Sequence, residues 1–125
     1  TARQFTAFVI EHKGKFLVQQ RPAGVVNGHL WEFPNFETTG VTVEAGELFK
    51  TQFKVVPPEL TPMRTVKHSI TRYRITLQTF HVRVKKNMLK TGGTWFSPKE
   101  LDSLAFSSAH KKLASAAAKS ILSDR

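Results

Sequence analysis

The sequence predicts an α+β domain in which a mixed β-sheet packs between α-helices. Short strand-like segments alternate with two helical segments, so neither type of element dominates the chain. The length of 125 residues suffices for one hydrophobic core. Hydrophobic residues make up 40% of the chain and include ten phenylalanines, which excludes a disordered tail. We therefore expect residues 1–125 to form a single domain.

The first third of the chain predicts two strands, a loop and a short extended piece. Gln4–Glu11 and Phe16–Gln20 are rich in the residues that favour strands. Between them, His12–Lys15 contains a glycine that can adopt the positive φ of a hairpin turn. Arg21–His29 has the proline and glycines of a loop. Leu30–Phe36 follows as an extended segment whose pairing is limited by its proline.

The middle of the chain predicts one helix and two longer strands. Val43–Phe53 has apolar residues at helical spacing, although its glycine weakens the helix. Met63–Ile70 and Tyr73–Lys85 are predicted strands. The apolar alternation of the second strand slips at Thr79, which indicates either a bulge or a strand buried on both faces.

The C-terminal part predicts a short strand and a helix. Thr94–Phe96 is the strand, and Ser97–Glu100 begins with Ser-Pro, which is typical of the start of a helical turn. Ala109–Leu122 has small and apolar residues every four positions, which predicts the clearest helix of the chain. Ser107 or Ser108 can cap it.

The charge of the chain is high and unevenly distributed. The net charge is +10 and the pI is about 10.3. No acidic residue occurs between Glu59 and Glu100. That interval contains nine basic residues: Arg64, Lys67, Arg72, Arg74, Arg83, Lys85, Lys86, Lys90 and Lys99. Such an interval favours a polyanionic partner, nucleic acid above all, over the alternative of a basic surface that only aids solubility.

Several classes of protein are excluded by composition. The chain has no cysteine, so it offers no disulfide, thiolate nucleophile or iron–sulfur ligand. No apolar run approaches the roughly 20 residues that span a bilayer, and no secretory signal is visible. We expect an intracellular protein, most simply in a bacterial cytoplasm. The five histidines lack metal-ligand spacing, so we predict no metal site; they are His12, His29, His68, His81 and His110.

Residues near the predicted loop each allow two interpretations. Trp31 and Phe33 could stack on a nucleobase, but core packing is favoured because large aromatic residues dominate small cores. Glu32 could bind a base edge or be solvated. Arg21 could pair with a phosphate or with a buried acid, and neither interpretation is favoured.

Charged residues near the two predicted helix starts also have alternatives. Glu44 and Glu47 are better explained by the helix dipole than by a metal ion, because magnesium needs several oxygens in fixed geometry. Lys111 and Lys112 could bind a phosphate at the helix N-terminus or be solvated.

Three blocks of sequence, taken in order, resemble one protein family. The first runs from FLVQQRP at Phe16–Pro22 to GHLWEFP at Gly28–Pro34, and it is similar to the entry of the nucleotide site of the Nudix fold. The helix motif Arg-Glu-apolar-X-Glu-Glu of Nudix hydrolases does not follow. The second block is VKHSITRY at Val66–Tyr73, and the third is TWF at Thr94–Phe96. The set resembles the C-terminal Nudix-like domain of the A/G-specific adenine DNA glycosylases, the MutY family.

This resemblance implies a Nudix-like fold that recognises a damaged base without breaking a bond. The family removes adenine paired with 8-oxoguanine, and its N-terminal helical domain, which carries an iron–sulfur cluster, flips and cleaves the adenine. The C-terminal domain is similar to the hydrolase MutT and faces the 8-oxoguanine strand. The resemblance thus implies duplex DNA containing 8-oxoguanine opposite adenine as the partner, and neither a catalytic residue nor a cofactor in this chain. We expect a monomer.

The resemblance also implies which residues read the lesion. Ile70, Thr71 and Arg72 stand where many members have Phe-Ser-His. The Thr71 hydroxyl would bind the N7/O8 edge of the oxidised purine, with an ordinary turn hydroxyl as the alternative. Ile70 would wedge beside the base, and Arg72 would contact phosphate. The flanking candidates for DNA contact are Lys67, His68, Ser69 and Arg74.

Two other functions remain open. A divergent Nudix-type hydrolase of oxidised nucleotides would need a carboxylate-rich metal site, which the sequence does not supply. A protein-interaction domain is disfavoured by the interval without acidic residues.

Overall fold

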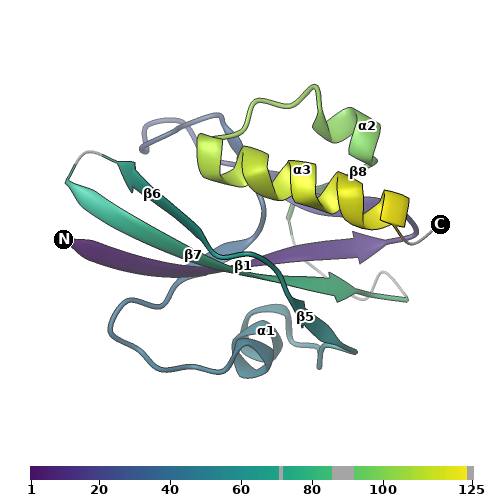
Figure 1. Ribbon diagram of the computed structural model, residues 1–125, viewed down its shortest axis with the longest axis horizontal. Helices are drawn as coiled ribbons and strands as arrows, with labels where there is room; N and C mark the ends of the chain where they lie inside the picture. Colours follow the sequence, from purple (N-terminus) through teal and green to yellow (C-terminus); the bar gives the residue numbers. More distant parts are fainter. Residues whose placement is uncertain (71, 86–91, 124–125) are drawn as a thin grey trace.

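A mixed β-sheet lies between helix α1 on one face and helix α3 on the other (Figure 1). The computed structural model describes residues 1–70, 72–85 and 92–123. Its elements are β1 (Ala2–His12), β2 (Lys15–Gln20), β3 (Trp31–Glu32), β4 (Asn35–Glu37), α1 (Ala45–Phe53), β5 (Leu60–Pro62), β6 (Val66–Ile70), β7 (Tyr73–Arg83), β8 (Thr94–Phe96), α2 (Pro98–Leu101) and α3 (Ser108–Ser123). The predicted fold class, a mixed sheet between helices, is confirmed.

Strand β1 is the centre of the sheet. It pairs in parallel with β7 along its whole length, from Ala2 opposite Arg74 to Glu11 opposite Arg83. On its other side, β1 pairs antiparallel with β4 near its start and with β2 near its end. Strand β2 then diverges to pair with β3 and β8. The sheet therefore opens between β1 and β2, and β4 fills part of the opening.

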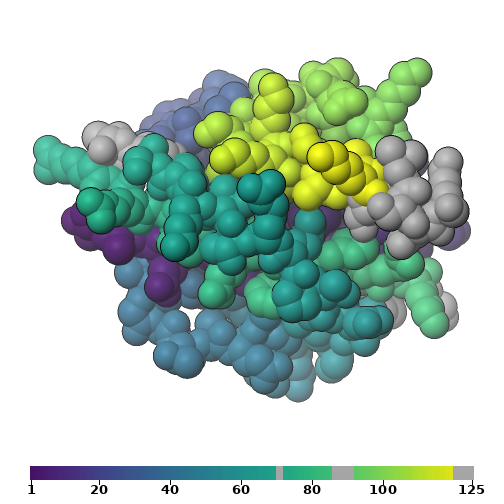
Figure 2. All heavy atoms as spheres, in the orientation of Figure 1, coloured from purple at the N-terminus to yellow at the C-terminus, as the bar shows by residue number. Residues whose placement is uncertain are grey.

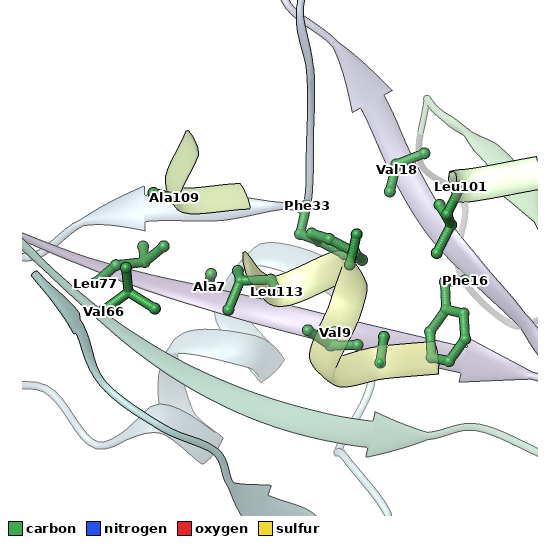
Figure 3. Close-up of a cluster of buried hydrophobic side chains, with 12 residues drawn as sticks. Ala7, Val9, Phe16, Val18, Phe33, Val66, Leu77, Leu101, Ala109 and Leu113 are labelled. Carbon is green, nitrogen blue, oxygen red and sulfur yellow. The ribbon is translucent and has the colours of Figure 1, made fainter. Parts of the chain in front are cut away.

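Both faces of the sheet carry a hydrophobic core. Ala7 and Val9 of β1 point toward α3, whereas Phe8 and Ile10 point toward α1, as the twofold alternation of a strand requires. Figure 3 shows Leu113 of α3 packed over the first of these clusters. Burying a side chain of this size contributes about 1.5–3 kcal/mol. Because β1 is buried on both faces, its sequence is a nearly continuous apolar run.

The predicted hairpin turn and the predicted cap at Ser97 are confirmed. The turn between β1 and β2 has positive φ at Lys13 (50°) and Gly14 (78°), as a two-residue hairpin requires. Ser97 and Glu100 form a capping box at the start of α2, with Pro98 in the first turn. Helix α1 begins at Ala45, two residues later than the sequence predicted.

One predicted extended segment is divided in the structure, and one predicted strand is shortened. Leu30–Phe36 becomes β3, which pairs with β2, and β4, which pairs with β1, because Pro34 between them has no N–H to continue a ladder. Only the carbonyl of Pro34 is used, accepting from the N–H of Phe8. Pro34 limits the pairing of this extended segment, as predicted, but the pairing of its two halves with different strands was not predicted.

The predicted strand Met63–Ile70 is shortened to β6, and strand β5, which was not predicted, precedes it; the gap between β5 and β6 lies opposite Thr79. Pro62 of β5 pairs with Phe80, and Val66 of β6 pairs with Leu77, so residues 63–65 face only residues 78–79. This is a bulge of one extra residue, and the Thr79 hydroxyl donates to the carbonyl of Arg64 within it at 2.7 Å. The predicted bulge is therefore present, but on the neighbouring strand. Strand β7 itself is regular: Leu77 and Thr79 are buried on one face while Gln78 between them is exposed, and burial moves to the other face only at Phe80 and Val82.

Candidate functional site

A cavity of about 260 Å³ opens on the α3 side of the sheet. It lies among the β2–β3 loop, strands β1, β4, β6 and β7, and the start of α3. Its walls are formed by Arg3, Phe5, Arg21, Val26, Asn27, Glu32, Asn35, His68, Tyr73, Ile75, Leu77, Ser107 and His110. Together with β3, which contributes Glu32, seven segments of the chain thus form one site.

The carboxylate of Glu32 organises one wall. Its Oε2 accepts hydrogen bonds from Arg21 Nη1 and from Asn35 Nδ2, both at 3.1 Å, and its Oε1 accepts from Gln19 Nε2 at 3.1 Å. The Glu32 side chain is 11% exposed. Of the two predicted partners of Arg21, a phosphate or a buried acid, the structure shows the buried acid. Glu32 is not solvated, and several of its lone pairs are already used by these donors, so it cannot offer all of them to a base.

The loop between β2 and β3 is held in one shape by Arg21. Its Nε donates to the carbonyl of Val26 at 2.8 Å, while its backbone N–H and carbonyl bond to Leu30 and His29. Gly28 packs so tightly against this loop that a Cβ there would lie 3.0 Å from a backbone oxygen. The loop is thus pre-organised at the rim of the cavity.

His110 forms a second wall and is neutral. Its Nδ1 accepts a hydrogen bond from the N–H of Phe33 at 3.1 Å, which requires that nitrogen to be unprotonated. The ring stacks on Phe33, whose other neighbour is Phe106. Burial lowers the pKa of His110 to about 4, against an opposing effect of Glu32. At neutral pH the proton of the imidazole is therefore on Nε2.

The cavity consequently offers one defined donor and one defined acceptor. The amide group of Asn35 uses its nitrogen to donate to Glu32 and to the carbonyl of Phe33, which leaves Oδ1 as an acceptor. His110 keeps its Nε2–H as a donor, because Nδ1 is already used. A donor and an acceptor of this kind suit the hydrogen-bonding edge of a nucleobase.

Arg3 and Tyr73 form the rim at the other side. Arg3 donates through Nε and Nη2 to both carboxylate oxygens of Glu37, at 2.8 and 2.6 Å. Its guanidinium also lies over two rings, 5.2 Å from the centroid of Phe5 and 5.1 Å from that of Tyr73. The two hydrogen bonds from Arg3 and one from Thr39 lower the pKa of Glu37 to about 2.

The β6–β7 hairpin divides the predicted DNA-binding residues between two faces. His68 lines the cavity, whereas Lys67 and Ser69 are exposed on the opposite face because strand residues alternate. Arg74 pairs with Ser69 and shares that face. The structure therefore brings only one of these four side chains into the cavity.

The predicted lesion-reading residues lie at the turn of the same hairpin. Ile70 is the last residue of β6, and Arg72 is exposed in the turn. Thr71 lies outside the described residues. The turn is next to the cavity, because Tyr73 pairs with Ile70 and lines it.

Basic residues of α3 approach the same hairpin. Lys111 and Lys112 are exposed near the start of α3, in its first and second turns. Burial, and to a lesser extent the charge of Lys112, lower the pKa of His68 on β6. Figure 2 shows α3 in yellow beside the hairpin in teal on this face of the molecule. The β6 edge is thus bordered by cations from α3 on one side and by Lys67 and Arg74 on the other.

Sequence reasoning missed four of the residues that define the cavity. Arg3 lay outside the predicted strand, and Asn35 and Tyr73 lay inside predicted strands with no distinguishing pattern. His110 was considered only as a metal ligand. Trp31 and Phe33 are correctly predicted as core residues, since both pack in the cluster beneath α3.

The residues do not fit the metal ion of a Nudix hydrolase. Helix α1 has Glu47 as its one acidic residue, and Glu44 lies just before the helix. The carboxylate of Glu44 lies close to Gly46, since a Cβ added there would be 3.1 Å from its Oε1. In the described part of the chain, no three His, Asp or Glu side chains could hold a metal ion together.

No helix of residues 1–70, 72–85 and 92–123 has the length and apolarity to cross a membrane.

Comparison with known proteins gives a family and several similar structures. Residues 6–116 match the family described as NUDIX domain, and curated protein sequences give no significant match. The E. coli ORF135 protein has a TM-score of 0.75 at 20% identity, covering 100% of this chain and 94% of that one. The C-terminal domain of mouse MUTYH, solved with human PCNA, has a TM-score of 0.71 at 22% identity, covering 98% and 88%.

A MutT protein from Methanosarcina mazei Go1 has a TM-score of 0.72 at 12% identity, with coverage of 95% and 94%. At these identities the likeness shows the fold alone. The family match, by contrast, extends over most of the chain. This chain belongs to the Nudix domain family.

Proposed function

We propose that this domain recognises 8-oxoguanine opposite adenine in duplex DNA, as the C-terminal module of an adenine DNA glycosylase. The observation that carries the proposal is a base-sized cavity at the β6 edge of the sheet, with exposed cations near the start of α3 on the face of the cavity and with Lys67 and Arg74 on the opposite face of the same edge. Cleavage of adenine, and the iron–sulfur cluster, would belong to a separate N-terminal domain.

The cations that would meet DNA are those without an acidic partner at the site. Arg3 and Arg21 face the cavity, but Glu37 and Glu32 neutralise them. The exposed residues that remain are Lys67, Arg72, Arg74, Lys111 and Lys112. Phosphate contacts from such side chains supply affinity and orientation without sequence preference. The lesion would then be distinguished at the hairpin turn, where Thr71 provides a hydroxyl.

A salt titration tests the phosphate contacts. Fluorescence anisotropy would measure binding of the 125-residue chain to a short labelled duplex between 50 and 200 mM salt, with 8-oxoguanine opposite adenine or with guanine opposite cytosine. Lys67→Gln and Lys112→Gln should each reduce the slope of log K against log salt by about 0.9. Lys13→Gln is the control, because Lys13 lies in the turn at the far end of β1. Undetectable binding at 50 mM salt, or an equal effect of Lys13→Gln, would refute the proposal.

The lesion preference needs a second variant. Thr71→Val keeps the shape of the side chain and removes its hydroxyl, so binding to the 8-oxoguanine duplex should weaken by about fivefold, as expected for one hydrogen bond. Binding to the undamaged duplex should not change. An equal loss for both duplexes would show that Thr71 supports the turn rather than reading the base.

Hydrolysis of an oxidised nucleotide is the second candidate, favoured by the cavity itself, which would accept a free nucleotide as well as one in DNA. It is opposed by the acids of α1, which are too few to hold magnesium. Magnesium-dependent release of pyrophosphate from 8-oxo-dGTP, abolished by Glu32→Gln but not by Lys67→Gln, would replace the DNA proposal with this one.

A further inference from the structure

Tyr73 is an exposed aromatic residue at the mouth of the cavity. It is the only tyrosine of the chain and is 39% exposed, although it lies in a strand that is buried farther along. It shares a face with Ile75 and Leu77, and all three line the cavity. A large ring left in solvent at the rim of a mainly apolar cavity with a few polar groups is suited to contact with a ligand.

The ring is held in place by a short chain of interactions. The guanidinium of Arg3 lies over it, and Glu37 fixes that guanidinium with two hydrogen bonds. Glu37 in turn accepts a hydrogen bond from Thr39 at 2.8 Å. Because two oxygens of one carboxylate define the plane of the guanidinium, Arg3 restricts the orientations available to the Tyr73 ring.

The chemistry around Tyr73 selects a nucleobase as its partner. A cavity of about 260 Å³ is at the small end of ligand pockets, which fits one ring system. The acceptor of Asn35 and the donor of His110 suit the polar edge of a base, and the nearby lysines suit the phosphates attached to it. An aromatic rim above mainly apolar walls that carry a few polar groups is suited to stacking and reading an unstacked base.

We propose that Tyr73 is a stacking platform for an unstacked nucleobase of the bound DNA, and that Arg3 is its positioning residue. This inference rests on the proposed DNA-binding function. It adds an element to the hairpin that the turn residues 70–72 do not provide, because a β-branched aliphatic, a hydroxyl and a guanidinium side chain contain no aromatic ring.

A single fluorine label reports on this residue. Because the chain has one tyrosine, growth with 3-fluorotyrosine places one ¹⁹F nucleus in the protein. Addition of the duplex with 8-oxoguanine opposite adenine should shift that resonance, since a base stacked on the ring changes its magnetic environment. The fully paired duplex should shift it less, because its bases stay stacked.

Two variants measure the contribution of the ring. Tyr73→Leu should weaken binding of the mispaired duplex by about 5-fold to about 150-fold, the range for loss of one base stack. Tyr73→Phe keeps the ring and should bind within about 2-fold of the unaltered chain. Neither change should alter the salt slope, because no phosphate contact is lost.

The role of Arg3 is tested by the same salt slope. Arg3→Gln should weaken binding of the mispaired duplex and move the ¹⁹F resonance of the free protein, while the slope stays constant. A slope reduced by about 0.9 would show instead that Arg3 contacts a phosphate. Arg3→Lys, which keeps the charge and loses the planar fork, should resemble Arg3→Gln.

The outcomes separate this inference from the function on which it rests. If the unaltered chain binds no DNA at 50 mM salt, the proposed function fails, and the inference fails with it. If the chain binds DNA but Tyr73→Leu binds equally well, or the ¹⁹F resonance does not move at saturation, only the inference is wrong. A shift produced by free 8-oxo-dGMP but not by the duplex would indicate a nucleotide site rather than a DNA site.

Discussion

Protonation of His110 is expected to destabilise the fold in mild acid. Folding lowers its pKa from the ordinary value of 6.5 to about 4, mainly because the ring is buried. The unfolded chain therefore binds more protons between these values, so stability is complete above about pH 6.5 and is lost as the pH falls toward 4. At 1.36 kcal/mol per pH unit, the whole loss is about 3 kcal/mol, of which about 2 kcal/mol falls between pH 7 and pH 5.

A variant isolates this contribution from that of the other titrating groups. His110→Asn does not titrate, and its side-chain oxygen can still accept the hydrogen bond that Phe33 donates to Nδ1. Urea unfolding, followed by tryptophan fluorescence at pH 7, 6 and 5, would give the free energy of unfolding of both proteins. His68 and the carboxylates are present in both, so their effects cancel in the difference.

The stability difference between the two proteins should shrink by about 2 kcal/mol from pH 7 to pH 5, because only the unaltered chain has the titrating imidazole. A difference that stays constant over this range would refute the reasoning. So would a direct NMR titration in which the imidazole of His110 protonates near pH 6.5, because the burial of the ring would then not oppose its charge.

Further substitutions test the scaffold of the site by the same unfolding measurement. Glu32→Ala should lower the free energy of unfolding by about 2–3 kcal/mol, since it leaves Arg21 and the other donors to Glu32 without their acceptor. The control, Glu47→Ala on the exposed face of α1, should lower it by less than about 0.5 kcal/mol. Gly28→Ala should destabilise by about 1–3 kcal/mol, because its Cβ would meet loop carbonyls at 3.0 and 3.1 Å. Gly46→Ala should instead stabilise by up to about 1 kcal/mol, because it lies within α1 and its Cβ meets only flexible side-chain ends.

Much of the fold follows from local sequence patterns. The hairpin turn with Gly14, the Ser97 cap and the helix at the C-terminus depend on residues close together in the chain, so periodicity and turn chemistry predict them. The division of Leu30–Phe36 was less predictable, because Pro34 can equally lie in an edge strand. The segment is divided because its first half pairs with β2 and its second half with β1.

The site was harder to predict because its interactions join distant segments. Arg21 and Glu32 are both in the first block of sequence, yet only the fold shows that they pair. The same holds for the contact of Arg3 with Tyr73 and for the hydrogen bond between Phe33 and His110, each of which joins residues far apart in the chain. Composition and charge indicated a polyanionic partner, but the placement of Lys67 and His68 on opposite faces required the register of β6 with β7.

The parallel pairing of β1 with β7 determines when this domain can fold during synthesis. Strand β1 emerges from the ribosome before β7, its parallel partner, whose paired residues follow more than 70 positions later in the chain. Until that partner has emerged, the apolar run Ala7–Ile10 has neither of its two cores to enter. Contacts of such sequence separation form slowly, so β1 is the segment most exposed to chaperones and to self-association during translation.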